Sequence, residues 1–94
     1  MNCKTVSFSD HAISQMFKRD ISVENVKHAM LTGETIAEYP TDKPFPSCLV
    51  LGYANKKALH VVAAKDELTG HCIVVTAYEP TLDIWEPNFR IKRK

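Results

Sequence analysis

The sequence has no long hydrophobic run and no familiar nucleotide-binding or metal-binding motif. No apolar stretch approaches the roughly 20 residues that a membrane-spanning helix needs. The start of the chain, MNCKTVSFSDH, lacks the apolar core of a secretory signal peptide. The patterns G-x-x-x-x-G-K-[ST], G-x-G-x-x-G and H-E-x-x-H are all absent. We therefore expect a cytoplasmic protein that does not bind membranes and has neither a resident metal nor a cofactor.

Cysteine is scarce: the chain has 3 cysteines, Cys3, Cys48 and Cys72, and no C-x-x-C pair. An odd number of cysteines without paired spacing is typical of reduced thiols in a cytosolic protein rather than of a disulfide framework. Cys48 and Cys72 lie in apolar runs, so both are predicted to be small core residues. A zinc site formed by Cys72, His71 and His60 is an alternative that we do not favour.

The charge is small and unevenly distributed. The formal net charge is +1, so composition alone does not indicate a nucleic-acid-binding protein. The last five residues, RIKRK, hold four of the 12 Lys and Arg residues, which leaves 8 basic against 11 acidic side chains in the rest of the chain. A basic tail can contact phosphate groups, but taken alone a solvated chain end is the simpler interpretation.

Helical patterns occupy residues about 9–32. In SDHAISQMFKRD either Ser9 or Asp10 can cap a first helix. SVENVKHAMLTG predicts a second helix that is capped by Ser22 and followed by Gly33 as its C′ residue. The short RDI link makes the two helices an αα-hairpin. The positions predicted to be buried are Ala12, Ile13, Met16 and Phe17 in the first helix and Val23, Val26, Met30 and Leu31 in the second.

The period of the hydrophobic pattern changes to two over residues about 34–78, where ETIAEY, SCLVLGYA, ALHVVAAKD and HCIVVTAY are predicted strands. The order ααββββ predicts an α+β fold: a four-stranded, mainly antiparallel sheet with both helices packed on one face. The central strands are apolar on both faces, so we expect the second face to be partly covered. Residues 79–94 form an irregular basic tail, which Trp85 and Phe89 are expected to pin onto the body of a single domain, 1–94.

One histidine stands in the middle of a predicted buried strand, KALHVVAAKD at 57–66. If residues 67–69 form a three-residue loop, His60 lies directly opposite Thr76, and Tyr78 falls on the same face of the sheet. A one-residue bulge would change this register. The cluster is a candidate active site, because histidine is the side chain that titrates near neutral pH. The alternative is a core histidine with satisfied hydrogen bonds.

Four stretches of the chain stand out together: HA at 11–12, YPTDKPFPSCLVLG, LHVV at 59–62 and TAYEP at 76–80. They resemble a family of small bacterial proteins, domain-of-unknown-function family 4258, and the resemblance extends over about residues 10–94. The family is similar to the RelE/ParE-like toxins, which implies a RelE-like fold of two helices and an antiparallel sheet. It also implies a small zinc-finger-like antitoxin as partner. Gln15 stands where the family usually has an arginine.

The resemblance implies metal-independent RNA cleavage of the mRNA interferase type, in which a 2′-hydroxyl attacks its own phosphate. That reaction needs a base, an acid and cations near the developing charge. His60 is then a candidate base or acid, Tyr78 a proton donor or stacking platform, and Thr76 a group that orients the phosphate. His11 becomes a second proton-transfer group if the first helix lies across the sheet. The candidate RNA-binding or phosphate-binding residues are Arg19, Arg90, Lys92 and Arg93.

The competing hypothesis is a non-catalytic binding module of the same fold that holds a protein partner or nucleic acid. The small net charge and Gln15 favour it. A DNA-binding regulator is a third candidate, but the second helix carries only Lys27 and His28 as basic groups. The exposure of His60 discriminates between the first two. Full burial beneath a helix with satisfied ring nitrogens indicates structure, whereas an open groove shared with Tyr78 and arginines indicates a ribonuclease.

Overall fold

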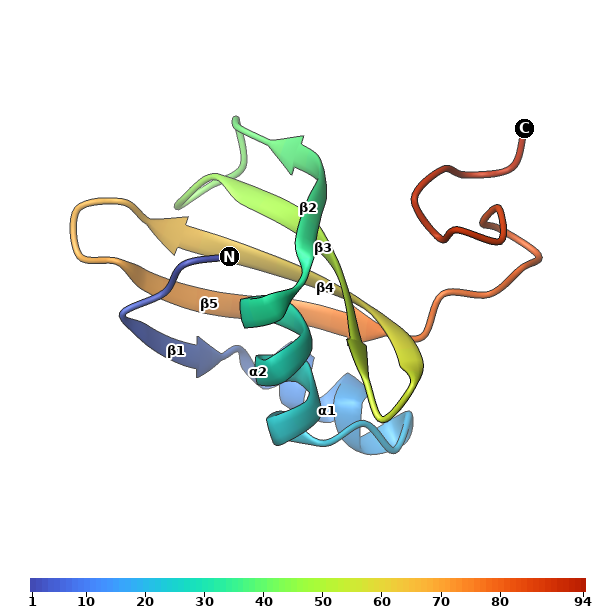
Figure 1. The fold of residues 1–94 in the computed structure, drawn as a ribbon. Helices are drawn as coiled ribbons and strands as arrows, with labels where there is room; N and C mark the ends of the chain where they lie inside the picture. Colours follow the sequence, from blue (N-terminus) through green and yellow to red (C-terminus); the bar gives the residue numbers. More distant parts are fainter.

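The computed structural model describes residues 1–94 as one mixed sheet with two helices (Figure 1). The elements are β1 (Thr5–Phe8), α1 (Asp10–Lys18), α2 (Val23–Thr32), β2 (Glu34–Tyr39), β3 (Ser47–Ala54), β4 (Lys57–Asp66) and β5 (His71–Tyr78). The strand order is β1-β5-β4-β3-β2, with β1 parallel to β5 and the other pairs antiparallel. The predicted α+β class and its two helices are confirmed, but the prediction of four strands is wrong.

The strand that the sequence pattern missed is β1, with the sequence TVSF. Four residues place only two side chains on each face of a sheet, which is too short a run to show the alternation of a strand. The structure adds β1 to the edge of β5, where Thr5 pairs with His71 and Phe8 with Val74. The order of the chain is therefore βααββββ, and the sheet has one parallel edge.

Both helices begin at the predicted caps. The Ser9 hydroxyl accepts a hydrogen bond from the Ala12 N–H at 3.0 Å, and the Ser22 hydroxyl accepts one from the Asn25 N–H at 3.1 Å. Each of these bonds satisfies a main-chain donor that has no partner within its helix. Neither helix is long and apolar enough to cross a membrane.

The buried strip of each helix is narrower than predicted. Four of the predicted positions, Ala12, Met16, Val26 and Met30, are buried, whereas Ile13, Phe17, Val23 and Leu31 are partly or largely exposed. Phe17 is the extreme case, with 88% of its surface exposed. In each of these helices, of 9 and 10 residues, the buried residues form one narrow strip. The apolar residues beside that strip therefore remain exposed.

Two glycines let α2 lie unusually close to the sheet. A Cβ atom added to Gly52 of β3 would lie 2.1 Å from the main-chain oxygen of Ala29 in α2, and one added to Gly33 would lie 2.3 Å from that of Leu51. Gly33 follows the helix as predicted, but its φ is −82°, so it does not adopt the left-handed conformation of a C′ glycine. Glycine is required at position 33 because a Cβ atom there would overlap the main chain of β3.

The hydrophobic core lies between the helices and one face of the sheet. From β4 this face receives Leu59, Val61 and Ala63, which alternate along the strand. Because successive side chains of a strand point to opposite faces, His60 and Val62 point away from the helices. Figure 1 shows the C-terminal segment beyond β5 lying apart from the two helices.

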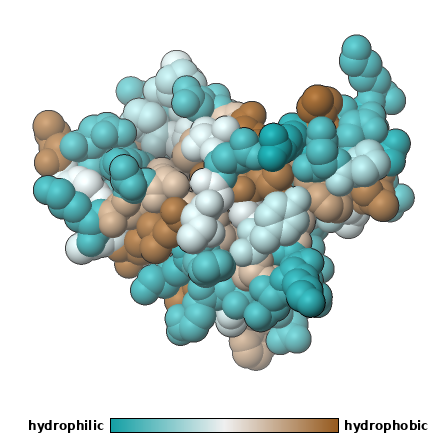
Figure 2. Space-filling view, in the orientation of Figure 1, coloured by the Kyte–Doolittle hydropathy of each residue, from teal (hydrophilic) through white to brown (hydrophobic).

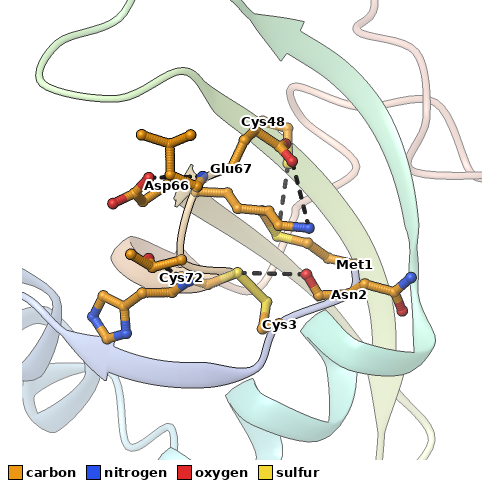
Figure 3. Close-up of polar contacts among 11 residues, drawn as sticks. Met1, Asn2, Cys3, Cys48, Asp66, Glu67 and Cys72 are labelled. Carbon is orange, nitrogen blue, oxygen red and sulfur yellow. Dashed lines mark hydrogen bonds and ion pairs between the residues drawn. A yellow bond between two sulfur atoms is a disulfide. The ribbon is translucent and has the colours of Figure 1, made fainter.

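The N-terminal segment is bonded covalently to the sheet (Figure 3). Cys3 and Cys72 form a disulfide across a sequence separation of 69, so the prediction of reduced thiols is wrong for these two residues. The parallel pairing of Val6 with Cys72 brings them together. Cys72 is fully buried as predicted, whereas Cys48 is free and only half-buried, with its Sγ 3.9 Å from Met1 Sδ.

The surface is a mixture of hydrophilic and hydrophobic groups. Figure 2 shows separate apolar patches among hydrophilic ones on the face that it presents. Several of the exposed apolar residues belong to the C-terminal segment, namely Leu82, Ile84 and Ile91. This segment has no helix or strand, and the isolated bridge between Trp85 and Lys92 is one of several contacts that link its two halves.

Candidate functional site

His60 is completely buried, with 0% of its surface exposed, on the face of the sheet that the helices do not cover. It lies in the middle of β4 between Leu51 of β3 and Tyr78 of β5. The cover comes from the C-terminal segment, whose Trp85 is only 6% exposed. The expected coverage of the second face and the expected role of Trp85 in pinning the tail are therefore confirmed.

The predicted register between β4 and β5 is wrong. His60 pairs with Tyr78, and Thr76 pairs with Val62. Two one-residue differences combine to produce this. The loop before β5 has four residues, 67–70, because Asp66 pairs with His71, and β5 contains one extra residue where the register shifts between Thr76 and Val74.

The two shifts cancel in one respect. Each alone would move the side chains of β5 to the opposite face, because strand side chains alternate with a period of two. Together they displace the register by two residues, so Thr76 and Tyr78 remain on the face of His60. Thr76 becomes a diagonal neighbour, at a distance of roughly 7–8 Å in an ideal sheet, and Tyr78 becomes the direct one.

Both ring nitrogens of His60 have partners. Nδ1 lies 3.2 Å from the Tyr78 hydroxyl, and Nε2 lies 2.8 Å from the main-chain oxygen of Phe89. The Trp85 ring stands edge-on to the imidazole, with ring centroids 4.4 Å apart. Burial lowers the pKa of His60 below the usual value of 6.5, although the hydrogen bond to Phe89 opposes this shift. The imidazole is therefore neutral near pH 7.

Tyr78 connects this buried histidine to an open cavity. The cavity has a volume of about 300 Å³ and is lined by Arg19, Ile21, Tyr78 and Glu79. Burial raises the pKa of the Tyr78 phenol, the nearby Tyr39 raises it further, and the Arg19 guanidinium lowers it. The cavity is therefore lined by a cation and by the residue whose hydroxyl contacts His60.

Arg19 is held at this position by the edge of the sheet. Its Nη1 donates to the main-chain oxygen of Ala77 at 2.9 Å, beyond the end of the β1 pairing. A guanidinium has five N–H donors, and this is the one hydrogen bond that the Arg19 side chain makes within the chain. The remaining donors are available at the cavity.

His11 is separate from this group. It lies in the first turn of α1 and is exposed. It lies eight positions before Arg19, a distance of about 12 Å along the helix axis. The structure therefore brings His60, Tyr78 and Arg19 together, keeps Thr76 close to them, and leaves His11 apart.

The basic residues of the tail are bound within the chain. Arg90 forms an ion pair with Glu34 of β2. Arg93 lies 3.6 Å from Glu86 and also donates to the main-chain oxygen of Leu82. The Lys92 ammonium lies 5.8 Å from the centre of the Trp85 ring. In this conformation these side chains hold the tail in place.

Two participants were not identified from the sequence. Glu79 lines the cavity beside Tyr78 and forms an ion pair of 3.7 Å with Lys57. Its position directly after Tyr78 in TAYEP is the sequence feature that could have identified it. The main-chain oxygen of Phe89 is the partner of His60, and a main-chain group leaves no signal in a sequence. No three His, Cys, Asp or Glu side chains form a group that could hold a metal ion.

The comparisons with known proteins give one match. The family model described as Domain of unknown function (DUF4258) matches residues 8–79, a range that includes His60 and Tyr78 but not Trp85 or Phe89. No curated protein and no solved structure matches the chain. Because the matched range is well over half of the sequence, this chain belongs to the DUF4258 family.

Proposed function

We propose that this protein is the toxin of a toxin–antitoxin pair, with a RelE-like fold, and that it cleaves RNA without a metal ion. The resemblance carried by LHVV and TAYEP supports an RNA-directed toxin. The observation that carries the proposal is the position of Tyr78. Its hydroxyl contacts the buried base His60, while the same residue lines an open cavity together with Arg19.

The chemistry follows from these contacts. The RNA 2′-hydroxyl gives its proton to the Tyr78 oxygen as Tyr78 passes its own proton to Nδ1 of His60. The 2′-oxygen then bonds to the adjacent phosphorus, the bond from phosphorus to the 5′-oxygen breaks, and a 2′,3′-cyclic phosphate forms. The departing 5′-oxygen takes a proton from water, which the open cavity admits, and the hydroxide left behind takes a proton from Tyr78 as Nδ1 of His60 returns its proton to Tyr78. His60 acts as the base through Tyr78 and does not touch RNA.

Arg19 and His60 have complementary roles. Negative charge develops on the phosphate oxygens as the 2′-oxygen attacks, and a guanidinium with unused N–H donors is well suited to stabilise it. Arg19 has this role. Burial keeps His60 neutral near pH 7 but also disfavours the imidazolium that forms, and the hydrogen bond to the Phe89 oxygen offsets part of that effect.

The partners are RNA and a small zinc-finger-like antitoxin, as the family resemblance implies. The tail cations Arg90, Lys92 and Arg93 do not contribute to RNA binding in this proposal, because intramolecular contacts engage them. Arg19 is the cation at the cavity.

The experiment is an RNA cleavage assay in EDTA with four proteins: wild type, Tyr78→Phe, His60→Gln and His28→Ala. His28 is an exposed histidine of α2 and serves as the matched control. We expect the wild type and His28→Ala to give 2′,3′-cyclic phosphate ends, and the other two to lose about 10²-fold or more of the rate. Undiminished cleavage by Tyr78→Phe, or no cleavage by the wild type on any RNA tested, contradicts the proposal.

A second candidate is the non-catalytic binding module. His60 is fully buried with both ring nitrogens engaged, which meets the criterion for a structural histidine except that the C-terminal segment, and not a helix, provides the cover. In that case the histidine is structural and the protein acts by holding a partner. The same assay separates the two functions, because the binding module cleaves no RNA while it still binds a protein partner expressed from a neighbouring gene.

A further inference from the structure

The C-terminal segment meets the candidate site through a main-chain group. Nε2 of His60 lies 2.8 Å from the Phe89 carbonyl oxygen, although 29 residues separate the two in the sequence. The Trp85 ring closes the space beside the imidazole, and its indole is almost fully buried. The buried environment of His60 is therefore completed by residues 85–89 rather than by the helices.

The carbonyl contact determines where the imidazole carries its proton. A carbonyl oxygen can only accept a hydrogen bond, so Nε2 must carry the hydrogen. In the neutral ring Nδ1 then has a free lone pair, and that lone pair faces the Tyr78 hydroxyl. Tyr78 must therefore donate its O–H to His60. The direction of this hydrogen bond is the direction in which the proposed reaction moves its proton.

The segment is folded back on itself and is joined to the sheet by an ion pair. Trp85 and Lys92 form a bridge, and the Glu86 N–H donates to the Ile91 oxygen at 2.8 Å. The ion pair between Arg90 and Glu34 joins the segment to β2, at the far side of the sheet from β1.

Phe89 itself has a special backbone conformation. Its φ is +58°, a left-handed value that residues with a Cβ seldom adopt. Its N–H donates to the Glu86 oxygen at 2.8 Å, which closes a tight turn. This turn aims the Phe89 carbonyl at His60.

We infer that Phe89 is a positioning residue: its carbonyl oxygen selects the Nε2–H form of His60 and thereby makes Tyr78 a hydrogen-bond donor to Nδ1. The C-terminal segment is in this view a working part of the site and not an RNA-binding arm. The catalytic consequence rests on the proposed function, whereas the effect on the histidine does not.

The test compares Phe89→Val with Phe89→Gly. Glycine adopts a positive φ without strain, whereas a β-branched residue strongly resists it, and both variants remove the phenyl ring. The ¹⁵N shifts of the His60 ring, assigned with His60→Gln, report which nitrogen carries the hydrogen. We expect the Nε2–H form in the wild type and in Phe89→Gly, and a mixture of both neutral forms in Phe89→Val. An Nδ1–H form in the wild type, or identical spectra for Val and Gly, overturns the inference.

A second variant reaches the same contact from another element. Glu34→Ala removes the ion pair that holds Arg90, and we expect it to shift the His60 ring toward the mixture of forms. Glu67→Ala removes an exposed ion pair with Lys65 that lies away from the tail, and it should leave the His60 spectrum unchanged. An unchanged spectrum in Glu34→Ala contradicts the role of this ion pair in holding the carbonyl.

Kinetics then separates this inference from the proposed function. If the wild type cleaves RNA, Phe89→Val should lower kcat by roughly tenfold with little change in KM, because Arg19 still binds the phosphate. A change in KM alone would contradict the positioning role. If the wild type cleaves no RNA, the proposed function fails, and the ¹⁵N spectra still decide whether Phe89 selects the form of His60.

Discussion

The Arg19 side chain is hydrogen-bonded to the main-chain oxygen of Ala77 at 2.9 Å, although the two residues are 58 positions apart in the sequence. This contact joins the C-terminal end of α1 to the free edge of β5, one residue before Tyr78. It explains how a helix that ends at Lys18 contributes a cation to a cavity at the end of the sheet.

The first prediction concerns the charge of Arg19. Its guanidinium lowers the pKa of Tyr78 against the effect of burial, so Arg19→Gln should raise the pKa of Tyr78. Arg19→Lys keeps the charge and should leave the pKa of Tyr78 close to that of the wild type. The measurement is ultraviolet titration of tyrosinate with Tyr78→Phe as the reference. The same pKa in the Gln variant and the wild type would show that the guanidinium does not act on Tyr78.

The second prediction concerns pH and stability. Burial lowers the pKa of His60 in the folded chain below 6.5, the value expected in the unfolded chain. The unfolded state therefore binds the proton more readily. The contribution of neutral His60 is fully present above pH 6.5 and is lost as the pH falls through the folded pKa. Urea unfolding between pH 8 and pH 5 should show a steeper loss of stability for the wild type than for His60→Gln. Parallel curves would contradict this.

The third prediction concerns the disulfide between Cys3 and Cys72. A crosslink over a separation of 69 residues restricts the unfolded chain, which corresponds to about 4 kcal/mol in the chain-entropy description. Cys3→Ser should therefore lower the free energy of unfolding by about that amount, and a reductant should have the same effect on the wild type. Cys48→Ser is the matched control and should cost less than about 1 kcal/mol. Equal losses in the two variants would refute the assignment.

The fourth prediction concerns the contact between α2 and β3. Gly52→Ala places a Cβ 2.1 Å from the Ala29 oxygen, so the helix must move, and we expect a loss of about 3 kcal/mol or more. Gly70→Ala meets mainly the flexible Lys4 side chain at a φ of +77° and should cost only about 1–2 kcal/mol. Chemical denaturation of both variants provides the measurement. A smaller loss for Gly52→Ala than for Gly70→Ala would be inconsistent with this packing.

The local parts of the fold could be predicted from the sequence. The caps Ser9 and Ser22, both helices and the four longer strands follow from local spacing and hydrogen-bonding groups. These features depend on residues within a few positions of one another.

The remaining features depend on distant contacts. The bond between Cys3 and Cys72 requires the parallel pairing of β1 with β5, and β1 is too short to be recognised by its pattern. The partner of Nε2 in His60 is a main-chain oxygen, which no residue type indicates. The direct neighbour of His60 depends on a loop length and a bulge that together shift the register by two.

The pairing of Tyr78 with His60 thus depends on two lengths, that of the loop at 67–70 and that of β5 at its extra residue. This has a consequence for related chains of different length. A relative that gains or loses one residue in the loop at 67–70, and nothing else, would turn the tyrosine away from the histidine. A compensating change in the extra residue near Val75 would restore the pair. Insertions and deletions at these two places should therefore occur together in functional relatives, so that the lengths of two separate segments vary as a linked pair.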